Sequence, residues 1–514
     1  MDIREIVPAS APFTEAQRMW LNGFLSGWLG KSVEAADSEA EPAADADAVV
    51  HPWHDDTMPL DDRMALAEGR MLPEQLSATM GQQDCGQCGY LCNSYAAALA
   101  GGSESDTSLC VPGGRETRVM VKDLLSTYAD QVGATSSDTA PAATEPGTRD
   151  HPVPARILAV DSITAEGSSK DIRHVAIDLS GSGLEYRAGD SLGVFVSNEP
   201  ALVDRLLATL RLSGLEFYIS KGQPISTREA LFRAKDITKP SDELLELLHA
   251  HATEASRETL SGLLETGVDE GVDVLDLITA FPPRGCDPIA LIDSLGTLQP
   301  RLYSISSSPE VHGPEVHTTV AVVRYDRDER ERLGVASTYF ADRSATDSWL
   351  PVYIQPTADF LLPEDGAKDM IMIGPGTGIA PFRAFLHERA ARGDSGRNWL
   401  FFGNPNAATD FLYEEELLTL KDNGVLTELE LAFSRDQAEK IYVQHRLLER
   451  GAEVWAWLEA GASIYVCGDA TRMAVDVHQA LLQIARDHGG LDENGAQAFI
   501  KGLVSEHRYL KDVY

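Results

Sequence analysis

The sequence has 514 residues, which is too long for a single hydrophobic core and indicates several domains. Its 43 basic side chains stand against 80 acidic ones, so the formal net charge at pH 7 is -37. A surface this acidic repels nucleic acid and anionic membranes, and neither is an expected partner. We find no apolar run of the roughly 18–20 residues that a transmembrane helix needs, and the first ten residues lack the pattern of a signal peptide.

The first part of the chain is predicted to hold an amphipathic helix and an acidic linker. Residues 13–30 place aromatic and leucine side chains at helical spacing. Two tryptophans on so short a helix, Trp20 and Trp28, suit contact with a partner or with a second copy of the chain, and packing on the chain's own core is the alternative. We therefore assign residues 1–32 to a helix that could form a homo-oligomer and residues 33–60 to a flexible acidic linker.

Four cysteines follow the linker with the spacing C-x2-C-x3-C-x17-C-x-P. Three clustered cysteines and a distant one near a proline are typical of iron–sulfur cubes. Zinc is the alternative, although zinc sites more often pair two C-x2-C knuckles. The stretch also resembles the small four-cysteine cluster domains of several anaerobic electron-transfer proteins, over about residues 71–130. We therefore expect a 4Fe–4S cluster in a reducing cytoplasm, with the ligands Cys85, Cys88, Cys92 and Cys110.

A second linker, residues 133–152, is rich in Pro, Ser, Thr and Ala. After it come short alternating stretches, at 155–162, 174–179 and 192–196, and such strands with Gly and Asp turns predict a small antiparallel barrel. From about residue 199 to 280 the leucine spacing becomes helical, which predicts a helical insertion. The stretch RLYSISSSP at 301–309 resumes the barrel, and a further strand is expected at 318–325.

The stretch that begins at Arg301 suits a strand beneath an isoalloxazine ring. On a strand Arg301 and Tyr303 project to one face and Ser304 to the other. Arg301 offers a planar fork for a pyrophosphate, Tyr303 a flat surface for stacking, and Ser304 a hydroxyl near the flavin N5. Residues 334–338 supply a glycine turn that opens a helix, whose free N–H groups suit a diphosphate. The terminal aromatic, Tyr514, could cover the flavin.

The last part of the chain alternates buried strands with helices. The strand 370–374 runs into the glycine loop and helix of 375–383, and a helix that starts there favours a phosphate. Further strands are expected at 399–403, 428–433 and 463–466. The ligand-approach residues of the loop are Gly374, Gly376, Thr377 and Gly378.

A cationic stretch follows the strand 428–433. Ser434, Arg435, Lys440 and Tyr442 stand at the carboxyl end of that strand, where they form a good pocket for a 2′-phosphate. This pocket favours NADPH over NADH, and a solvated charged turn is the alternative.

Six motifs occur in one order along the chain: RLYS at 301–304, GVAS at 334–337, GPGTGIAPFR at 374–383, SRDQ to KIYVQ at 434–444, CGD at 467–469 and a final DVY. Together they resemble the diflavin reductases, which are ferredoxin–NADP reductase-like enzymes with a helical connecting domain. FFGNPN at 401–406 and DFLYEEEL at 410–417 are most similar to the flavoprotein subunits of the NADPH–sulfite reductases. The resemblance covers about residues 153–514.

This resemblance implies a role for each matching residue. The FAD set is Arg301, Leu302, Tyr303, Ser304, Thr319, Val320, Ala321, Tyr325, Gly334, Val335, Ala336 and Ser337. The NADPH set is Ser434, Arg435, Lys440, Tyr442, Gln444 and Asp476. Ser304, Cys467 and Asp512 match the polar group around the hydride path, and Tyr514 matches the aromatic over the flavin. Cys286 matches nothing and is interpreted as a core or surface thiol.

The chain departs from this family at its N-terminal end, because residues 1–150 contain no flavodoxin domain and the cysteine cluster stands in its place. A cluster carries single electrons, as FMN does, so the chemistry tolerates the exchange. The predicted fold is multidomain: a small α-helical iron–sulfur domain at 61–132, an antiparallel β-barrel FAD domain at 153–365 with a helical insertion at about 199–297, and an α/β doubly wound NADPH domain at 366–514.

The resemblance implies electron transfer from NADPH through FAD and the 4Fe–4S cluster to a haemoprotein, with the sirohaem subunit of an assimilatory sulfite reductase as the first choice of acceptor. Another haemoprotein, a cytochrome or a ferredoxin is the alternative acceptor. A protein of a different class, a redox-sensing regulator, would leave the NADPH site unexplained.

Overall fold

The computed structural model describes residues 51–54, 58–86, 88–129, 132, 146–220, 222–357 and 359–514, all of which lie in one compact unit, Ala46–Tyr514. The predicted helix at 13–30 and most of both predicted linkers lie outside these residues. Within the described part of the chain, no helix combines the length and the apolar character that crossing a bilayer takes.

The four cysteines lie in a small helical segment, which we call the cysteine module (residues 58–86 and 88–129). Its helices pack around a core that includes Leu76, Tyr95, Leu99 and Val121. The sequence analysis gave no bounds for these helices. The helices are α2 (Leu60–Ala67), α3 (Leu72–Thr79), α4 (Cys92–Gly101) and α5 (Gly114–Thr127).

An antiparallel six-stranded sheet follows, with the order β6-β3-β10-β1-β2-β7. A single bridge between Ile305 and Thr318 joins the two ends of this order. The strands are β1 (Val153–Ser162), β2 (Ile172–Asp178), β3 (Ser191–Val194), β6 (Arg301–Ser304), β7 (Glu315–Ala321) and β10 (Trp349–Gln355). The short helices of this part are α12 (Pro309–His312) and α13 (Val335–Thr338), and a π-helical turn η4 (Tyr339–Arg343) follows α13.

The predicted strand at 318–325 was wrong in its bounds. β7 stops at Ala321, because its pairing with β2 ends where Ala321 faces Ile172. The chain then forms a separate hairpin of β8 (Arg324–Arg327) and β9 (Arg330–Leu333). Asp328 and Glu329, both with positive φ, make the tight turn of that hairpin.

Between β3 and β6 the chain forms the expected helices, and Leu206, Leu244 and Leu248 are buried in their core. The sequence analysis missed the hairpin of β4 (Phe217–Ser220) and β5 (Gln223–Ser226), because apolar Phe217 and Ile219 are exposed on either side of the buried Tyr218, so β4 shows no alternation of polar and apolar residues. The helical elements are α6 (Pro200–Leu210), α7 (Thr227–Glu229), η3 (Ala230–Ala234), α8 (Asp242–Ala250), α9 (Glu254–Thr266), α10 (Val274–Ala280) and α11 (Pro288–Asp293).

A parallel five-stranded sheet, in the order β13-β12-β11-β14-β15, forms the C-terminal part. Its strands are β11 (Met370–Ile373), β12 (Asn398–Asn404), β13 (Glu428–Phe433), β14 (Ser463–Gly468) and β15 (Tyr509–Val513). Its helices are η5 (Gly376–Ile379), α14 (Ala380–Arg392), α15 (Ala407–Asp410), α16 (Glu414–Asp422), α17 (Val443–Glu449), α18 (Gly451–Glu459), α19 (Met473–Asp487) and α20 (Glu493–Ser505).

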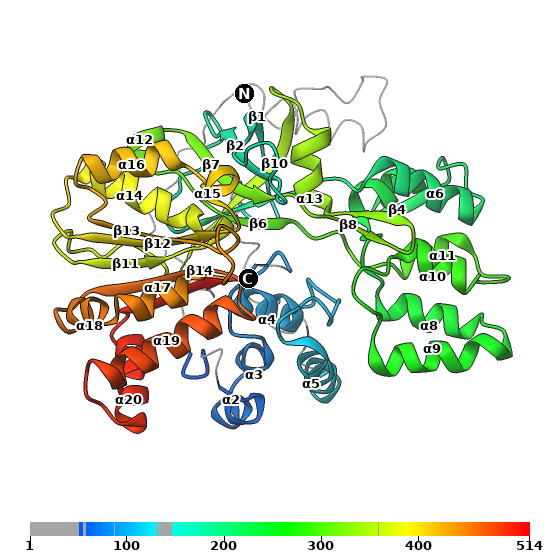
Figure 1. The fold of residues 1–514 in the computed structure, drawn as a ribbon. Coiled ribbons are helices and arrows are strands. Elements are labelled where there is room, and N and C mark those ends of the chain that lie inside the picture. Colours follow the sequence, from blue (N-terminus) through cyan, green and yellow to red (C-terminus); the bar gives the residue numbers. More distant parts are fainter. Residues whose placement is uncertain are drawn as a thin grey trace, which may run out of the picture. The chain divides into compact units, whose positions relative to one another are not determined.

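Helices cover both faces of this sheet (Figure 1). Ile371 and Ile373 point into a core formed with α17, α18 and α19, whereas Met370 and Met372 point into a core formed with α14 and α16. A strand buried on both faces reads as a continuous apolar run, as MIMI does. The sequence analysis assigned no strand to the chain end, yet residues 509–513 form the edge strand β15, in parallel register with β14.

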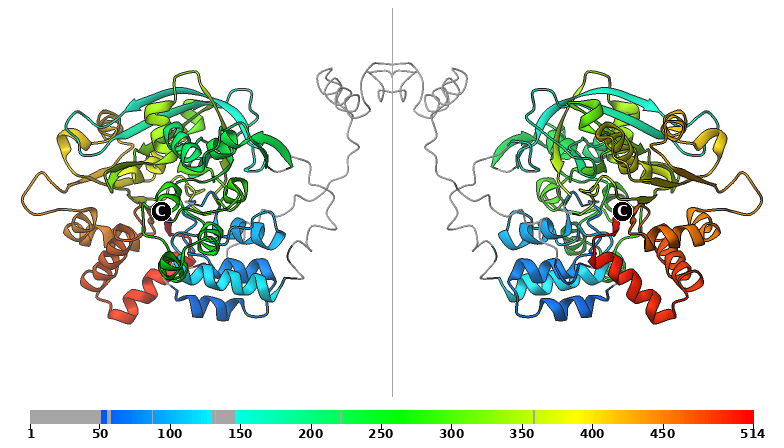
Figure 2. Two further views of the ribbon diagram at one scale, coloured as in Figure 1. Left: turned by 90° about the vertical axis from the view of Figure 1, so that its right-hand side faces the viewer. Right: turned by 90° about the vertical axis from the view of Figure 1, so that its left-hand side faces the viewer.

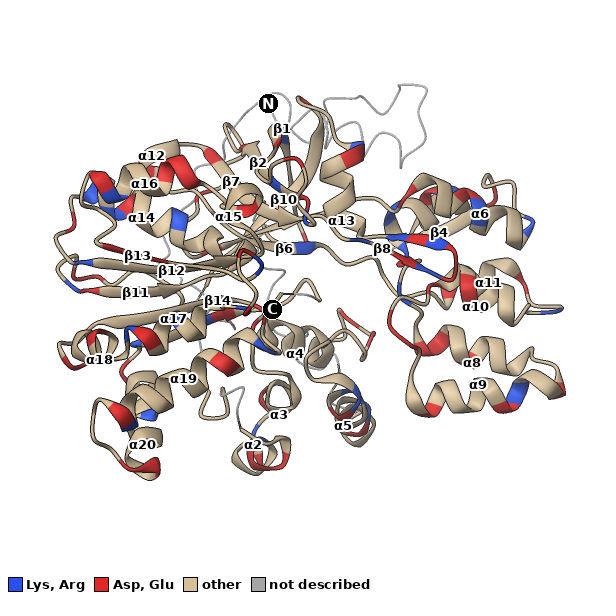
Figure 3. Cartoon of the chain, viewed as in Figure 1, with Lys and Arg blue, Asp and Glu red and all other residues tan. Residues whose placement is uncertain are grey.

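The acidic excess is spread over the molecule. Acidic side chains lie on most of the labelled helices, including α2, α8, α16 and α20 (Figure 3). The charge therefore gives no single docking face that a basic partner would be expected to choose.

Four histidines lie together between the six-stranded sheet and the helices α14 and α16. The ring centroids of His174 and His317 are 4.7 Å apart, those of His317 and His312 4.5 Å, and those of His312 and His387 5.1 Å. Burial and the nearby Arg383 lower the pKa of His174 to about 4, and burial with the neighbouring histidines lowers the pKa of His317 to about 2. Glu416 forms ion pairs with Arg383 and His387 beside these rings.

This cluster predicts acid sensitivity of the fold. Both His174 and His317 are neutral in the folded protein but take up protons near pH 6.5 when unfolded, so stability falls as pH drops from about 6.5 toward about 4. Each such histidine contributes a slope of up to about 1.4 kcal/mol per pH unit. We expect His317→Gln to flatten the pH dependence of the denaturant midpoint, whereas the exposed His151→Gln should leave it unchanged. An unaltered slope in the His317 variant would contradict this account.

Candidate functional site

The strand β6 carries the residues that the sequence analysis placed beneath a flavin. It pairs with β3, where Tyr303 faces Leu192 and Ser304 faces Ser191. Leu302, Tyr303 and Ser304 line a cavity of about 460 Å³, and Arg301 lines this cavity as well as a larger one of about 920 Å³. The two cavities also share Val111, Thr238 and Lys239, so they adjoin each other at these residues and Arg301.

Two adjoining cavities suit a long ligand with an aromatic ring at one end and phosphates near its middle. Arg301 stands at the junction, where a pyrophosphate would need a guanidinium. Deeper in the larger cavity, Arg332 Nη1 is buried and has no hydrogen-bond partner among the described residues. An unpaired buried guanidinium nitrogen is costly without a ligand, so these residues fit FAD.

The other residues of the predicted FAD set divide into two groups. Thr319 and Ala321 line the smaller cavity, and Tyr325, Gly334 and Val335 line the larger one. The side chains of Val320 and Ala336 instead pack into the core of the six-stranded sheet, because they lie on the inner faces of β7 and α13. The Ser337 hydroxyl accepts a hydrogen bond from the Val323 N–H at 3.1 Å. These three could therefore contact FAD only through their backbone.

Ser304, Cys467 and Asp512, which stand far apart in the sequence, meet beside the smaller cavity. The Ser304 hydroxyl donates to Asp512 Oδ2 at 2.6 Å, and the Cys467 thiol donates to the same oxygen at 3.4 Å. Burial raises the pKa of Asp512, and the negative charge of Asp84 adds to this effect. Burial and the neighbouring Asp512 raise the pKa of the Cys467 thiol well above its usual value, so it stays protonated.

Tyr514 follows β15 and lines the smaller cavity. Its hydroxyl lies 2.9 Å from the Thr377 hydroxyl, and its N–H donates to Gly468 O at 3.0 Å. The last residue is therefore fixed at both ends, with its ring beside the residues of β6. The prediction that it lies at the flavin pocket agrees with this position.

The glycine loop after β11 is tightly constrained. Gly376 has φ +61, and a Cβ on Gly378 would meet Cys467 O at 2.1 Å, so both positions favour glycine. A Cβ on Gly374 would meet Gly378 O at 2.4 Å. The loop thus packs directly against the end of β14, where ligands bind in parallel sheets.

The predicted NADPH residues stand at the carboxyl edge of the same sheet. Ser434 and Arg435 follow β13, and the Arg435 side chain is exposed. Gln444 Nε2 donates to Asp476 Oδ2 at 2.9 Å, which joins α17 to α19. Lys440 and Tyr442 are exposed on the segment before α17. These side chains are accessible to a coenzyme, and their role in binding NADPH stays a prediction.

Two residues near the coenzyme loop escaped the sequence analysis. Ser169 and Lys170 belong to the connection between β1 and β2, yet Arg435 Nη1 donates to Ser169 Oγ at 3.1 Å, and Lys170 Nζ donates to Asn404 Oδ1 at 2.9 Å. A Cβ on Gly376 would lie 3.7 Å from Lys170 Nζ. A lysine in a short connection carries no sequence pattern, so only the fold reveals this cation at the glycine loop.

The four cysteines of the module line one small cavity, together with Tyr90, Tyr95 and Pro112. None of them forms a disulfide. Burial raises the pKa of Cys88 to about 11 and that of Cys92 well above its usual value, and Cys110 raises both further. The chemistry of these four thiols suits a thiolate-bound metal centre. The positive charge of a bound metal would lower the raised pKa values and keep the coordinating sulfurs deprotonated.

Within the described residues, however, no group of three or more His, Cys, Asp or Glu side chains stands in a metal-binding geometry. The predicted 4Fe–4S cluster therefore stays a prediction. Cys286 lies apart from the four, partly buried against the core of the helical insertion.

Comparison with known proteins identifies the two halves that follow the module. Residues 145–339 match the family model of an FAD binding domain, and residues 372–479 match that of an oxidoreductase NAD-binding domain. The NADPH sulfite reductase flavoprotein alpha-component of Escherichia coli strain K12 is 44% identical over 409 residues, which are 78% of this chain and 67% of the relative. That of Photorhabdus laumondii is 46% identical over 371 residues, 71% of this chain and 61% of the relative. The chain thus spans two thirds or less of these relatives.

The hydrogen bonds to Asp512 generate a kinetic prediction. We expect Asp512→Asn to slow reduction of bound flavin by NADPH about 10- to 100-fold, as loss of one hydrogen bond to a charged group does. In the parent the rate should also fall as pH drops through the raised pKa of Asp512, whereas the variant has no carboxyl group to titrate. Stopped-flow flavin bleaching measures both effects. The exposed Glu459→Gln on α18 is the control, and a parental rate and pH profile for Asp512→Asn would contradict the assignment.

Proposed function

The chain belongs to the family of the NADPH sulfite reductase flavoprotein alpha-components and is an NADPH-dependent oxidoreductase, and from this premise we propose that it is the reductase component of an assimilatory sulfite reductase. FAD, held by the residues of β6 and of the two cavities, would supply hydride acceptance from NADPH and release of single electrons, and a 4Fe–4S cluster held by Cys85, Cys88, Cys92 and Cys110 would supply one-electron transfer toward a sirohaem protein that reduces sulfite to sulfide. The acceptor and the cluster are proposals, because the chain spans only part of its relatives.

One observation carries this proposal: the cysteine loop and the flavin strand line the same cavity. Cys85 and Cys88 share it with Tyr303, Ser304 and Tyr514. The C-terminal end of the chain accordingly lies beside the cysteine module in every view (Figure 1 and Figure 2). A one-electron carrier held by these cysteines would adjoin the flavin ring, which supports a relay rather than a remote structural role.

The chain's own residues prepare the hydride step. Asp512 fixes the Ser304 hydroxyl beside the flavin cavity, and the Cys467 thiol holds Asp512 from its other side. Tyr514, which lines the smaller cavity, would cover the ring surface that the nicotinamide needs, and its hydrogen bond with Thr377 would have to break to admit the nicotinamide.

We also propose the finer fold assignment. The bridge between Ile305 and Thr318 supports a closed antiparallel barrel for the FAD domain, and the helices on both faces of the parallel sheet support a doubly wound NADPH domain. Oligomer formation through residues 1–32 stays a prediction, since that segment lies outside the described residues.

Coenzyme choice is proposed to rest on Arg435 and its neighbours Ser434, Lys440 and Tyr442. Arg435→Ala should raise the KM for NADPH about tenfold or more while changing the KM for NADH little, because only NADPH carries the 2′-phosphate. Steady-state kinetics with both coenzymes measure this, with the exposed Arg486→Ala on α19 as the matched control. Equal loss with both coenzymes would refute the assignment.

The cluster assignment has its own test. In full-length protein, Cys88→Ser should lower iron and acid-labile sulfide and abolish electron delivery to a sirohaem sulfite reductase, because loss of one thiolate destabilises the cluster. Reduction of ferricyanide by NADPH should persist, since the flavin site is intact. Cys286→Ser, at a thiol outside the cavity, should behave as the parent in both assays.

The same assay separates the alternatives. Zinc without iron in the parent protein would make the cysteine site a zinc site. Full haem reduction by the Cys88 variant would make the cysteines structural or sensory. Reduction of a cytochrome or a ferredoxin, but not of the sirohaem protein, would keep the relay and change the acceptor.

A further inference from the structure

We propose that the cysteine module forms one wall of the FAD site and retains the cofactor, so that FAD leaves only when the module separates from the six-stranded sheet. This inference rests on the proposed assignment of FAD to the two joined cavities. It differs from the proposed electron relay, because it assigns to the module a role in binding FAD. That role does not require the module to transfer electrons.

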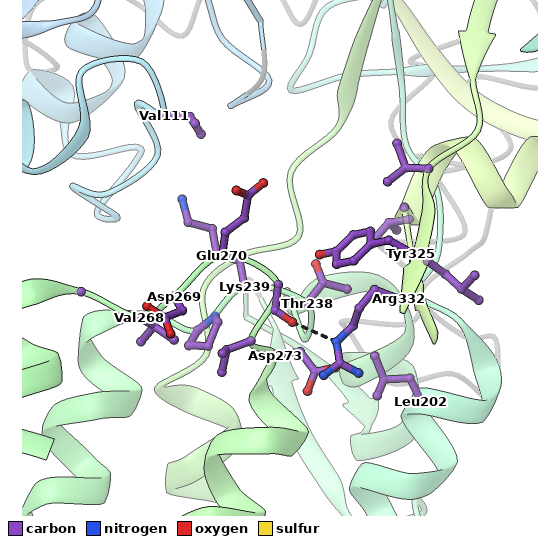
Figure 4. A pocket seen from close by; sticks show the side chains of 18 of the residues that line it. Val111, Leu202, Thr238, Lys239, Val268, Asp269, Glu270, Asp273, Tyr325 and Arg332 are labelled. Atoms are coloured by element: carbon purple, nitrogen blue, oxygen red, sulfur yellow. Dashed lines mark hydrogen bonds between the residues drawn. The ribbon is translucent and has the colours of Figure 1, made fainter. Parts of the chain in front are cut away.

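The lining of the two cavities is the first observation. Asp84, Cys85, Gly86 and Leu109 of the module face β6 and Tyr514 across the smaller cavity. The larger cavity is lined by Ser108, Gly114, Arg115 and Arg118 of the module, and Val111 lines both. In Figure 4, Val111 stands on the opposite side of the larger cavity from Tyr325 and Arg332. A ligand that fills this space therefore touches the module along its length.

The close approach of the module to β6 is the second observation. Gly86 has φ +64, and a Cβ there would meet Leu302 Cδ1 at 2.6 Å and Leu302 Cβ at 2.9 Å. Gly89 has φ +77, and a Cβ there would meet Pro300 at 3.0 Å. The Tyr353 hydroxyl, from β10, donates to Gly89 O at 3.2 Å. At these two glycines the cysteine loop thus packs on Leu302 and Pro300 with no room for a side chain.

Polar contacts around this packing hold the module at several separate points. Arg118 and Lys122 of α5 each bind Asp242 at 2.8 Å. Gln299 Nε2 donates to Glu104 at 3.3 Å, just before β6. Lys239 Nζ donates to Ser108 O at 3.3 Å.

Beside the contact of Gln299 with Glu104, the Arg149 guanidinium lies 3.2 Å from the centre of the Tyr90 ring. Contacts on several elements fix the orientation of a module, whereas a single contact would leave it free to turn. These contacts therefore hold the module in a fixed position, with the same residues always facing the two cavities.

The test uses the full-length protein with FAD bound. Gly86→Ala must push the cysteine loop away from Leu302, and we expect FAD to dissociate about tenfold faster. The matched control is Gly69→Ala in the same module: Gly69 also has positive φ, but nothing lies within 4 Å of its Cβ position. The release rate is read from the rise of FAD fluorescence after dilution into buffer without FAD.

A second variant covers the case in which Gly86→Ala disturbs the cysteines or the fold. Lys122→Gln removes an ion pair between α5 and Asp242 without touching the cysteine loop or any residue that lines the two cavities, and it too should speed FAD release. Its control is Asp204→Asn, which weakens an ion pair with Arg228 inside the helical insertion. FAD release at the parental rate in both Gly86→Ala and Lys122→Gln would overturn the proposal.

Iron and acid-labile sulfide, measured on the same samples, keep this test distinct from that of the proposed function. A parent protein without iron would contradict the cluster and leave the difference in FAD release standing. A parent protein with iron and no difference in release would contradict the wall alone.

Discussion

The hydrogen bond between Ser304 and Asp512 is the constraint around which the site is arranged. It joins the strand that carries the flavin residues to the last strand of the parallel sheet, across 208 positions of sequence. Its geometry requires both sheets to be seated correctly on one another. Between the six-stranded sheet and the helices α14 and α16, the buried His174 and His317 support this seating with rings that stay neutral at physiological pH.

Much of this arrangement follows from local sequence signals. The apolar run MIMI predicts a buried parallel strand, and in the structure helices cover both faces of that strand. The glycines that follow it are needed sterically, because a Cβ at Gly374 or Gly378 would collide with backbone atoms. The motif RLYS likewise predicts its own strand and the cavity that this strand lines. These signals are short-range: each depends on residues that are neighbours in the chain.

The features that the sequence did not reveal depend on tertiary context. In the hairpin of β4 and β5 the apolar Phe217 and Ile219 are exposed while Tyr218 is buried, so β4 lacks the alternation of polar and apolar residues that makes a strand recognisable. The chain end forms β15 because it pairs with the edge of β14. The sequence of residues 509–513 alone does not predict this pairing. Lys170 reaches the glycine loop from another sheet, and Val320 points into a core although its neighbours line a cavity.

The contact between Gly86 and Leu302 has a consequence for how such chains can diverge. The two positions share one small volume, so a larger residue at 86 is compatible with the fold only if the residue at 302 becomes smaller. Leu302 is also flanked by the flavin residues Arg301 and Tyr303, which leaves the strand little freedom to retreat. Across homologous chains that carry the module, these two positions should therefore change as a correlated pair, and a chain without the module is free to vary at 302 alone.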